Sequence, residues 1–191
     1  MTESAAEVLL EQYHLKAVID LRTFIEREEM PDYGIAGVEY LHIPLFDEAR
    51  AGSSHEKSTR DMDARIPDMT DLYRRIVTDE CSAARIKEVI GILNDNRREG
   101  AVLWHCTEGK DRCGIISAWF LLSKGIEQDT VMRDYLKTNE TAEKRAAYYY
   151  NVALEKCGSV AVAEKVRDAF LAKRGYMEPV IDILAQRFMQ A

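Results

Sequence analysis

One stretch in the middle of the chain constrains the fold more than any other. Residues 101–105, AVLWH, are almost wholly apolar, which is typical of a strand buried in a parallel sheet. The polar run 106–110 follows directly. From about Arg112 to Ser123 apolar residues then lie on most sides of a predicted helix, which places that helix at the centre of the molecule.

The rest of the chain alternates between predicted strands and helices before it becomes wholly helical. The expected strands are 17–21 and 38–44, and the expected helices are 4–13, 22–30, 66–78, 82–97, 127–137, 139–156, 160–173 and 176–189. We therefore predict an α/β fold, in which a small, mainly parallel sheet is flanked by helices. A single domain over 1–191 would contain this α/β core in residues 1–126, with the loop 105–114, and a helical part in 127–191.

Composition narrows the classes of function. The 33 acidic residues outnumber the 26 basic ones, and the net charge of −7 argues against nucleic-acid binding, which needs a basic face. The longest apolar run, 114–122, is far shorter than the roughly 20 residues of a membrane span. No basic segment precedes the first apolar residues, so we expect no secretory signal, and the four cysteines then indicate reduced thiols in a cytoplasmic protein.

The loop between the central strand and helix, HCTEGKDRCG over 105–114, has the features of an anion site. Backbone N–H groups of a tight loop and of a helix N-terminus point at one spot. Gly109 lets the backbone close around a phosphate, and Arg112 offers a fork of donors that suits a phosphoryl group. Cys106 would face the bound anion, where positive surroundings lower the pKa of a thiol and make it a nucleophile.

This segment resembles the signature H-C-x-x-G-x-x-R-[ST]-G of the cysteine-dependent protein tyrosine phosphatases. Its GKDR form is similar to a bacterial tyrosine/serine phosphatase family that has a mycobacterial member active on phosphoinositides. Val18–Arg22 looks like the first strand of that family, and Tyr40–Asp47 looks like the strand that delivers its general acid. The resemblance implies the tyrosine-phosphatase fold and hydrolysis of phosphate monoesters through a cysteinyl-phosphate, with no metal and no other cofactor.

The resemblance also implies roles for individual residues. Cys106 would be the nucleophile and Arg112 would stabilise the transition state. Asp47 is the expected general acid because it opens a polar loop directly after a strand, and Asp111 in the catalytic loop is the alternative. The phosphate would be bound by Thr107, Glu108, Gly109, Lys110, Asp111 and Arg112. The residues expected to support the loop from behind are His105, Cys113 and Arg22.

Cys113 departs from the family pattern, which has Ser or Thr after the loop arginine. A thiol donates more weakly than the hydroxyl that assists breakdown of the cysteinyl-phosphate, so turnover could be slow. Cys113 would also lie close to Cys106, where oxidation could join the two in a reversible disulfide. The alternative is that Cys113 is a tolerated small residue. The upstream N-R-D-x-G-G segment of the family is also absent.

The expected substrate is phosphotyrosine in proteins, with phosphoserine or phosphothreonine as further possibilities. Two alternatives stay open. In a phosphoinositide phosphatase, Lys110 would recognise an extra phosphate of the inositol ring, although it could equally be a solvated loop lysine, and Glu108 puts a negative charge nearby. A catalytically weak phosphate-binding module would be explained by Cys113. We expect no nucleic-acid partner and no stable membrane insertion, and the sequence leaves the oligomeric state open.

Overall fold

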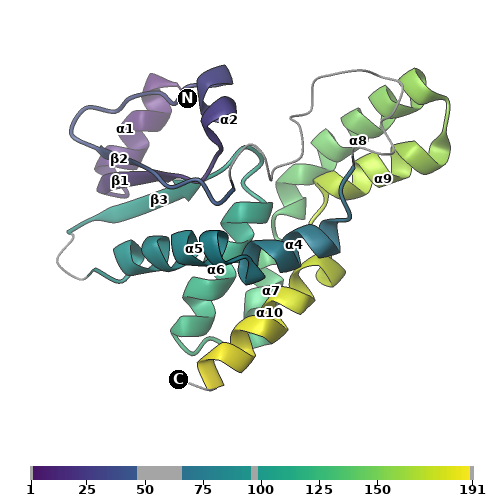
Figure 1. The fold of residues 1–191 in the computed structure, drawn as a ribbon. Helices are drawn as coiled ribbons and strands as arrows, with labels where there is room; N and C mark the ends of the chain where they lie inside the picture. The colour runs from purple at the N-terminus through teal and green to yellow at the C-terminus, as the bar shows by residue number, and fades with distance from the viewer. Residues whose placement is uncertain (1, 47–65, 96–98, 190–191) are drawn as a thin grey trace.

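A computed structural model of the chain describes residues 2–46, 66–95 and 99–189 and has an α/β architecture (Figure 1). Its sheet has the strand order β2-β1-β3, and both strand pairs are parallel. The strands are β1 (Leu15–Asp20), β2 (Glu39–His42) and β3 (Ala101–His105). The predicted small parallel sheet is therefore confirmed, and all three strands end at the same edge. The polar loop that is predicted to begin at Asp47 lies outside the described residues.

Helices flank this sheet and make up the whole C-terminal part, as predicted from the sequence. Their bounds are α1 (Glu3–Glu11), α2 (Phe24–Glu29), α4 (Met69–Thr78), α5 (Glu80–Leu93), α6 (Asp111–Ser123), α7 (Gln128–Leu136), α8 (Asn139–Cys157), α9 (Val160–Phe170) and α10 (Arg174–Met189). In the described parts of the chain, no helix combines the length and the apolar character that crossing a bilayer requires.

Side chains of β1 alternate between the two faces of the sheet, because successive residues of a strand point in opposite directions. Val18 joins a small cluster with Ala6 of α1 and Ile35. Ile19 and Leu21 join the large core on the other face. The central strand is therefore packed on both faces, which explains why most of its residues are apolar.

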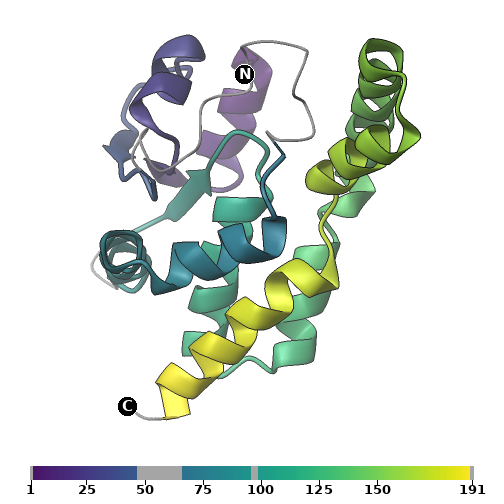
Figure 2. The same ribbon diagram turned by 45° about the vertical axis from the view of Figure 1, so that its right-hand side comes forward.

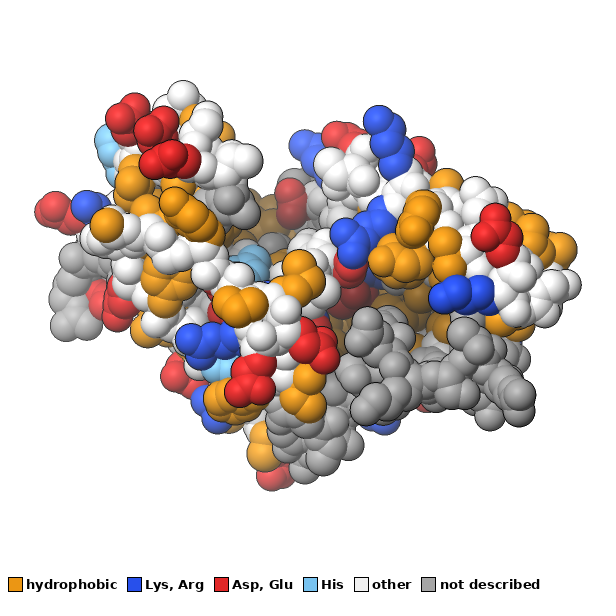
Figure 3. All heavy atoms as spheres, turned by 90° about the horizontal axis from the view of Figure 1, so that it is seen from above, with side chains coloured by type: hydrophobic (Ala, Val, Ile, Leu, Met, Phe, Trp, Pro, Cys, Tyr) orange, Lys and Arg blue, Asp and Glu red, His pale blue; other side chains and the backbone are white. Residues whose placement is uncertain are grey.

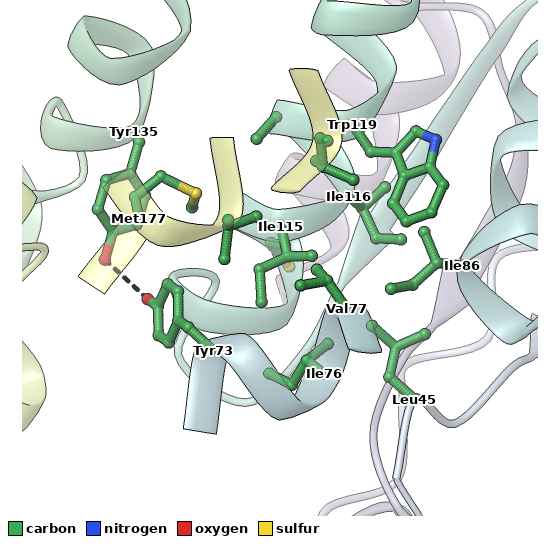
Figure 4. Close-up of a cluster of buried hydrophobic side chains, with 14 of the residues drawn as sticks. Leu45, Tyr73, Ile76, Val77, Ile86, Ile115, Ile116, Trp119, Tyr135 and Met177 are labelled. Atoms are coloured by element: carbon green, nitrogen blue, oxygen red, sulfur yellow. Dashed lines mark hydrogen bonds between the residues drawn. The ribbon is translucent and has the colours of Figure 1, made fainter. Parts of the chain in front are cut away.

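The apolar helix α6 lies at the centre of the large core (Figure 4). Its Ile115 and Ile116 are completely buried against side chains of α4, α5 and α10. Gly114, also in α6, lies where an added Cβ would come within 2.9 Å of the Tyr135 ring of α7. Dense packing thus fixes the first turn of α6, and it thereby also fixes where the preceding loop ends.

The helices α8 and α9 form a hairpin that projects from the rest of the molecule (Figures 1 and 2). Gly158 connects them in the left-handed conformation, with φ of 64°. Tyr149 of α8 stacks on Phe170 of α9, with ring centroids 4.4 Å apart. α10 then returns to pack on α4, α6 and α7. The base of the hairpin comes close to the loop that precedes α6.

Candidate active site

The loop 106–110 connects the end of β3 to the start of α6, at the edge where the parallel strands end. Cys106 is buried at the beginning of this loop, whereas Thr107 and Glu108 are exposed. Gly109 has a φ of 65°, in the left-handed region that glycine adopts without steric cost. The predicted strand, tight turn and helix N-terminus are therefore all present, and the loop amides belong to the geometry of an anion site.

The two loop cysteines lie side by side beneath the surface. The Cys113 thiol donates a hydrogen bond to the Cys106 sulfur over 3.5 Å. This hydrogen bond, with the positive charge of Arg112, outweighs burial and lowers the pKa of Cys106 to about 5. The same contact and burial raise the pKa of Cys113. Cys106 is consequently a thiolate at neutral pH, and Cys113 remains its protonated donor.

Glu26 of α2 holds the loop arginine by both terminal nitrogens. Nη1 of Arg112 donates to Oε2 of Glu26 over 2.6 Å, and Nη2 donates to Oε1 over 2.7 Å. Arg112 also donates to the Thr107 hydroxyl over 3.2 Å, and that hydroxyl donates to Glu26. Burial would raise the pKa of Glu26, but the hydrogen bonds and charge of Arg112 lower it to about 2. A phosphoryl group that accepts two hydrogen bonds from Arg112 has to displace at least one of these acceptors.

Behind the loop, an ion-pair network holds His105. Arg22 bridges the carboxylates of Asp20 and Asp32, with contacts of 2.8 Å to each. Asp32 in turn accepts a hydrogen bond from Nε2 of His105 over 3.1 Å, if that nitrogen carries the proton. The ligand atoms of Asp20, Asp32 and His105 lie within 4.8 Å of one another, a spacing that could suit a metal ion. Arg22 already supplies the positive charge there, so the cluster is better explained as a network that orients the loop.

The side chain of Lys110 is 2% exposed and extends to the end of α9. Its ammonium contacts the backbone carbonyls of Ala169 and Leu171 and lies 3.2 Å from Oδ1 of Asp111. The idea that Lys110 is a solvated loop lysine is therefore wrong. Its long side chain crosses to the end of α9 because those carbonyl groups need a donor.

Asp111 starts α6 and faces the helical part of the molecule. Its Oδ1 accepts a hydrogen bond of 2.6 Å from the Tyr73 hydroxyl, which also lies 2.7 Å from the Tyr135 hydroxyl. Figure 4 shows the bond between the two tyrosines. Burial and the Asp111 charge raise the pKa of Tyr73, so the hydroxyl stays a donor. Asp111 is thus tied to a buried network of helices α4 and α7.

A pocket of about 190 Å³ lies between the loop and the base of the α8–α9 hairpin. Figure 3 views the molecule from above, where the surface is hollowed between the part that carries α2 and this hairpin. At the pocket, Arg145 of α8 pairs with Glu108 of the loop over 2.9 Å. The pocket is lined by Thr107, Glu108, Lys110, Thr138, Thr141, Ala142, Arg145 and Phe170.

The structure brings Cys106, Arg112 and Cys113 together, as the sequence analysis expected, and places His105 and Arg22 behind them. Asp47 lies outside the described residues. The sequence analysis did not predict the hydrogen bonds between Glu26 and Arg112. The one sequence signal at Glu26 is Thr23-x-x-Glu26 after a strand, which has the pattern of a capping box. That box is present. Its pattern locates the start of α2, but it does not predict that the same carboxylate also reaches the loop 86 residues further on.

The comparisons with known proteins indicate one family. The family model described as "Tyrosine phosphatase family" matches residues 1–191. The triple specificity protein phosphatase PtpB of Mycobacterium tuberculosis is 33% identical over 103 residues, which cover 54% of this chain and 36% of PtpB. A protein of Cupriavidus necator named as a tyrosine-protein phosphatase is 34% identical over 84 residues, which cover 44% of this chain and 29% of that protein. The matched segments thus span about a third of the length of these relatives.

A crystal structure of a cysteine-to-serine variant of P. aeruginosa TpbA in complex with phosphotyrosine also aligns with the chain. The alignment covers 100% of this chain and 83% of that one, with 16% sequence identity and a TM-score of 0.33. This likeness is too distant to bear on the assignment.

Proposed function

We propose, since this chain belongs to the tyrosine phosphatase family, that it hydrolyses phosphate monoesters through a cysteinyl-phosphate and acts mainly on phosphotyrosine in proteins. The observation that carries the proposal is the buried Cys106 thiol beside the Cys113 thiol and the guanidinium of Arg112. These two neighbours lower its pKa to about 5. A thiolate beside a guanidinium is a nucleophile suited to phosphorus. The positive field comes from the protein, and the reaction as proposed uses no metal.

In the first step, the Cys106 sulfur attacks phosphorus, an S–P bond forms, and the ester P–O bond breaks. The transition state spreads negative charge over the equatorial oxygens, where loop amides and Arg112 stabilise it. The leaving oxygen takes a proton from a general acid. Water then attacks phosphorus, the S–P bond breaks, and the thiolate is restored while the water proton passes to the same group.

We assign the general acid to Asp47. The ring centroid of Phe46, its neighbour in sequence, lies 5.9 Å from Cζ of Arg112, and this contact supports the assignment. Asp111 is the alternative. Its Oδ1 already accepts from Tyr73 and contacts Lys110, which makes it less available to a leaving group.

The phosphoinositide alternative depended on Lys110, and the ammonium of that residue is occupied by carbonyl groups of the helical part. This contact removes the argument for recognition of a second phosphate by Lys110. The weak-binding alternative depended on Cys113, whose thiol supports the nucleophile while remaining a poorer donor than a hydroxyl. A slow second step is therefore part of the proposal.

The first test is release of phosphate from a phosphotyrosine peptide under reducing, metal-free conditions. Wild type is expected to turn over, and Cys106→Ser is expected to lose activity by about 10⁴-fold or more, since removing a catalytic nucleophile costs rates of this order. Cys81→Ser, at an exposed cysteine, is the control. One stoichiometric burst followed by arrest would favour the binding module, and activity retained in Cys106→Ser would overturn the proposed mechanism.

The acid is tested with two substrates that differ in leaving group. Asp47→Asn is expected to slow hydrolysis of phosphotyrosine much more than hydrolysis of para-nitrophenyl phosphate, because the second leaving group needs less protonation. The same selective loss in Asp111→Asn, with Asp47→Asn unaffected, would transfer the role to Asp111.

A further inference from the structure

The side chain of Lys110 makes a contact that phosphate binding does not explain. A buried ammonium needs oxygen partners, and this one finds them at Ala169, Leu171 and Asp111. Ala169 is in the last turn of α9, and Leu171 directly follows that helix. Carbonyl groups there lack donors within the helix and carry the negative end of its dipole. Lys110 therefore supplies α9 with a C-terminal cation from the catalytic loop.

Asn139 holds the same connection from another side. Its Nδ2 donates to the Ala172 carbonyl over 2.9 Å, and its Oδ1 accepts from the Ala172 N–H over 2.8 Å. Asn139 is the first residue of α8, so it ties the start of the hairpin to the chain that leaves it. The link between α9 and α10 is thus held both by the catalytic loop and by the base of α8.

These contacts set the distance between the hairpin and the loop. The pocket of about 190 Å³ lies between the two. Its wall on the loop side includes Thr107 and Glu108, the two residues after the nucleophile. Its wall on the hairpin side includes Arg145 and Phe170. The pocket is smaller than the roughly 300–1,000 Å³ of typical small-molecule sites, so it suits one side chain rather than a separate ligand.

We propose that Lys110 and Asn139 are positioning residues for substrate selection. They hold the hairpin against the loop, and the pocket so formed takes a side chain next to the phosphorylated residue of a protein substrate. The inference rests on the proposed function, which supplies a phosphate bound at the loop. Lys110 acts through α9 rather than on the phosphate, because an added phosphate would have to replace three oxygen partners of its ammonium.

The test compares kcat/KM for a phosphotyrosine peptide with kcat/KM for free phosphotyrosine, which contains the same scissile bond. Asn139→Ala is expected to lower the ratio about tenfold, by raising KM for the peptide, since it removes two hydrogen bonds of the tether. Arg145→Ala, in the pocket wall, is expected to lower it similarly. Lys144→Ala removes a neighbouring exposed cation of α8 that does not line the pocket, and it is expected to leave the ratio unchanged.

Lys110→Met keeps the stem but removes the ammonium, and the same drop in the ratio is expected. A merely structural role would reduce the active fraction and lower kcat/KM for both substrates by the same factor. Equal losses of kcat/KM in Asn139→Ala would therefore overturn the inference. An unchanged ratio in both Asn139→Ala and Arg145→Ala would overturn it as well.

Failure of wild type to hydrolyse either substrate would count against the proposed function alone. The ratio is therefore also measured by equilibrium binding of the two compounds to Cys106→Ser, with and without Asn139→Ala. Tighter binding of the peptide that Asn139→Ala abolishes supports the inference without turnover, and equal binding of the two compounds to Cys106→Ser contradicts it.

Discussion

Two cations of the same loop, two residues apart, face opposite parts of the molecule. Arg112 turns toward α2, where Glu26 engages it beside the Cys106 sulfur. Lys110 turns toward the helical part, where it meets the end of α9 and Asp111. A positive charge in this loop therefore does not by itself mean that the charge would contact a bound phosphate.

The partners of each cation explain the difference. On the α2 side, the hydrogen bond from the Cys113 thiol and the charge of Arg112 lower the pKa of Cys106 to about 5. The hydrogen bonds and charge of Arg112 lower the pKa of Glu26 to about 2. On the helical side, Lys110 contacts two backbone carbonyls and the Asp111 carboxylate, and that carboxylate also accepts a hydrogen bond from the Tyr73 hydroxyl. Changes on the α2 side should thus alter the rate and its pH dependence, whereas changes on the helical side should alter stability and selection.

The largest effect is expected from oxidation on the α2 side. One equivalent of hydrogen peroxide oxidises the Cys106 thiolate to a sulfenic acid and is reduced to hydroxide. The Cys113 thiol, 3.5 Å away, then attacks that sulfur, forms a disulfide and releases water. We expect complete loss of activity that dithiothreitol restores, with a linked peptide of 106 and 113 in mass mapping.

Cys113→Ala provides the control for this oxidation. It should still lose activity, but progressively beyond recovery, because no second thiol intercepts the sulfenic acid. Loss of activity in wild type without a linked peptide would show that Cys113 is only a tolerated small residue.

The next largest effect is expected when the Glu26 carboxylate that binds Arg112 is removed. Glu26→Gln should lower kcat/KM by about 10- to 100-fold, since hydrogen bonds between charged groups contribute roughly 1.5–3 kcal/mol and the guanidinium is no longer held in place. Glu28→Gln, on the exposed side of α2, should have no effect. Faster turnover in Glu26→Gln would mean instead that the carboxylate competes with phosphate for Arg112.

A smaller effect is expected in the pH profile. The acidic limb of kcat/KM for wild type should lie near pH 5, where Cys106 loses its proton. Cys113→Ala removes a donor that stabilises the thiolate, so the limb should move to higher pH by about 1 unit or more. Cys113→Ser should restore the low limb and speed the second step. An unshifted limb in Cys113→Ala would assign the low pKa to Arg112 and the loop amides alone.

The smallest effect on activity is expected on the helical side. Tyr73→Phe deprives Asp111 and Tyr135 of a buried partner. The free energy of unfolding in urea should fall by about 1–3 kcal/mol, the usual cost of leaving a buried polar group unpaired. The pH profile should stay in place. A shifted acidic limb in Tyr73→Phe would remove the distinction between the two sides of the loop.

Much of the site could be predicted from residues 105–114 alone. Glycine at 109, arginine at 112 and an apolar strand and helix on either side dictate a local geometry, because short-range sterics and burial leave few alternatives. The adjacency of Cys113 to Cys106 was implied by the resemblance to the phosphatase family, in which a Ser or Thr takes that position. Which way Lys110 turns was not, because a flexible side chain takes its direction from partners that lie 59 and 61 residues away.

The sequence by itself therefore determined the order of elements, the parallel sheet and the strand–loop–helix unit that carries Cys106. These follow from patterns of neighbouring residues. Only the tertiary structure decided three sets of contacts. Glu26 accepts hydrogen bonds from Arg112, Tyr73 connects Asp111 with Tyr135, and Lys110 donates to a carbonyl at the end of α9. Each of these contacts joins segments far apart in the chain, and packing of the helices around α6 is what brings them within hydrogen-bonding distance.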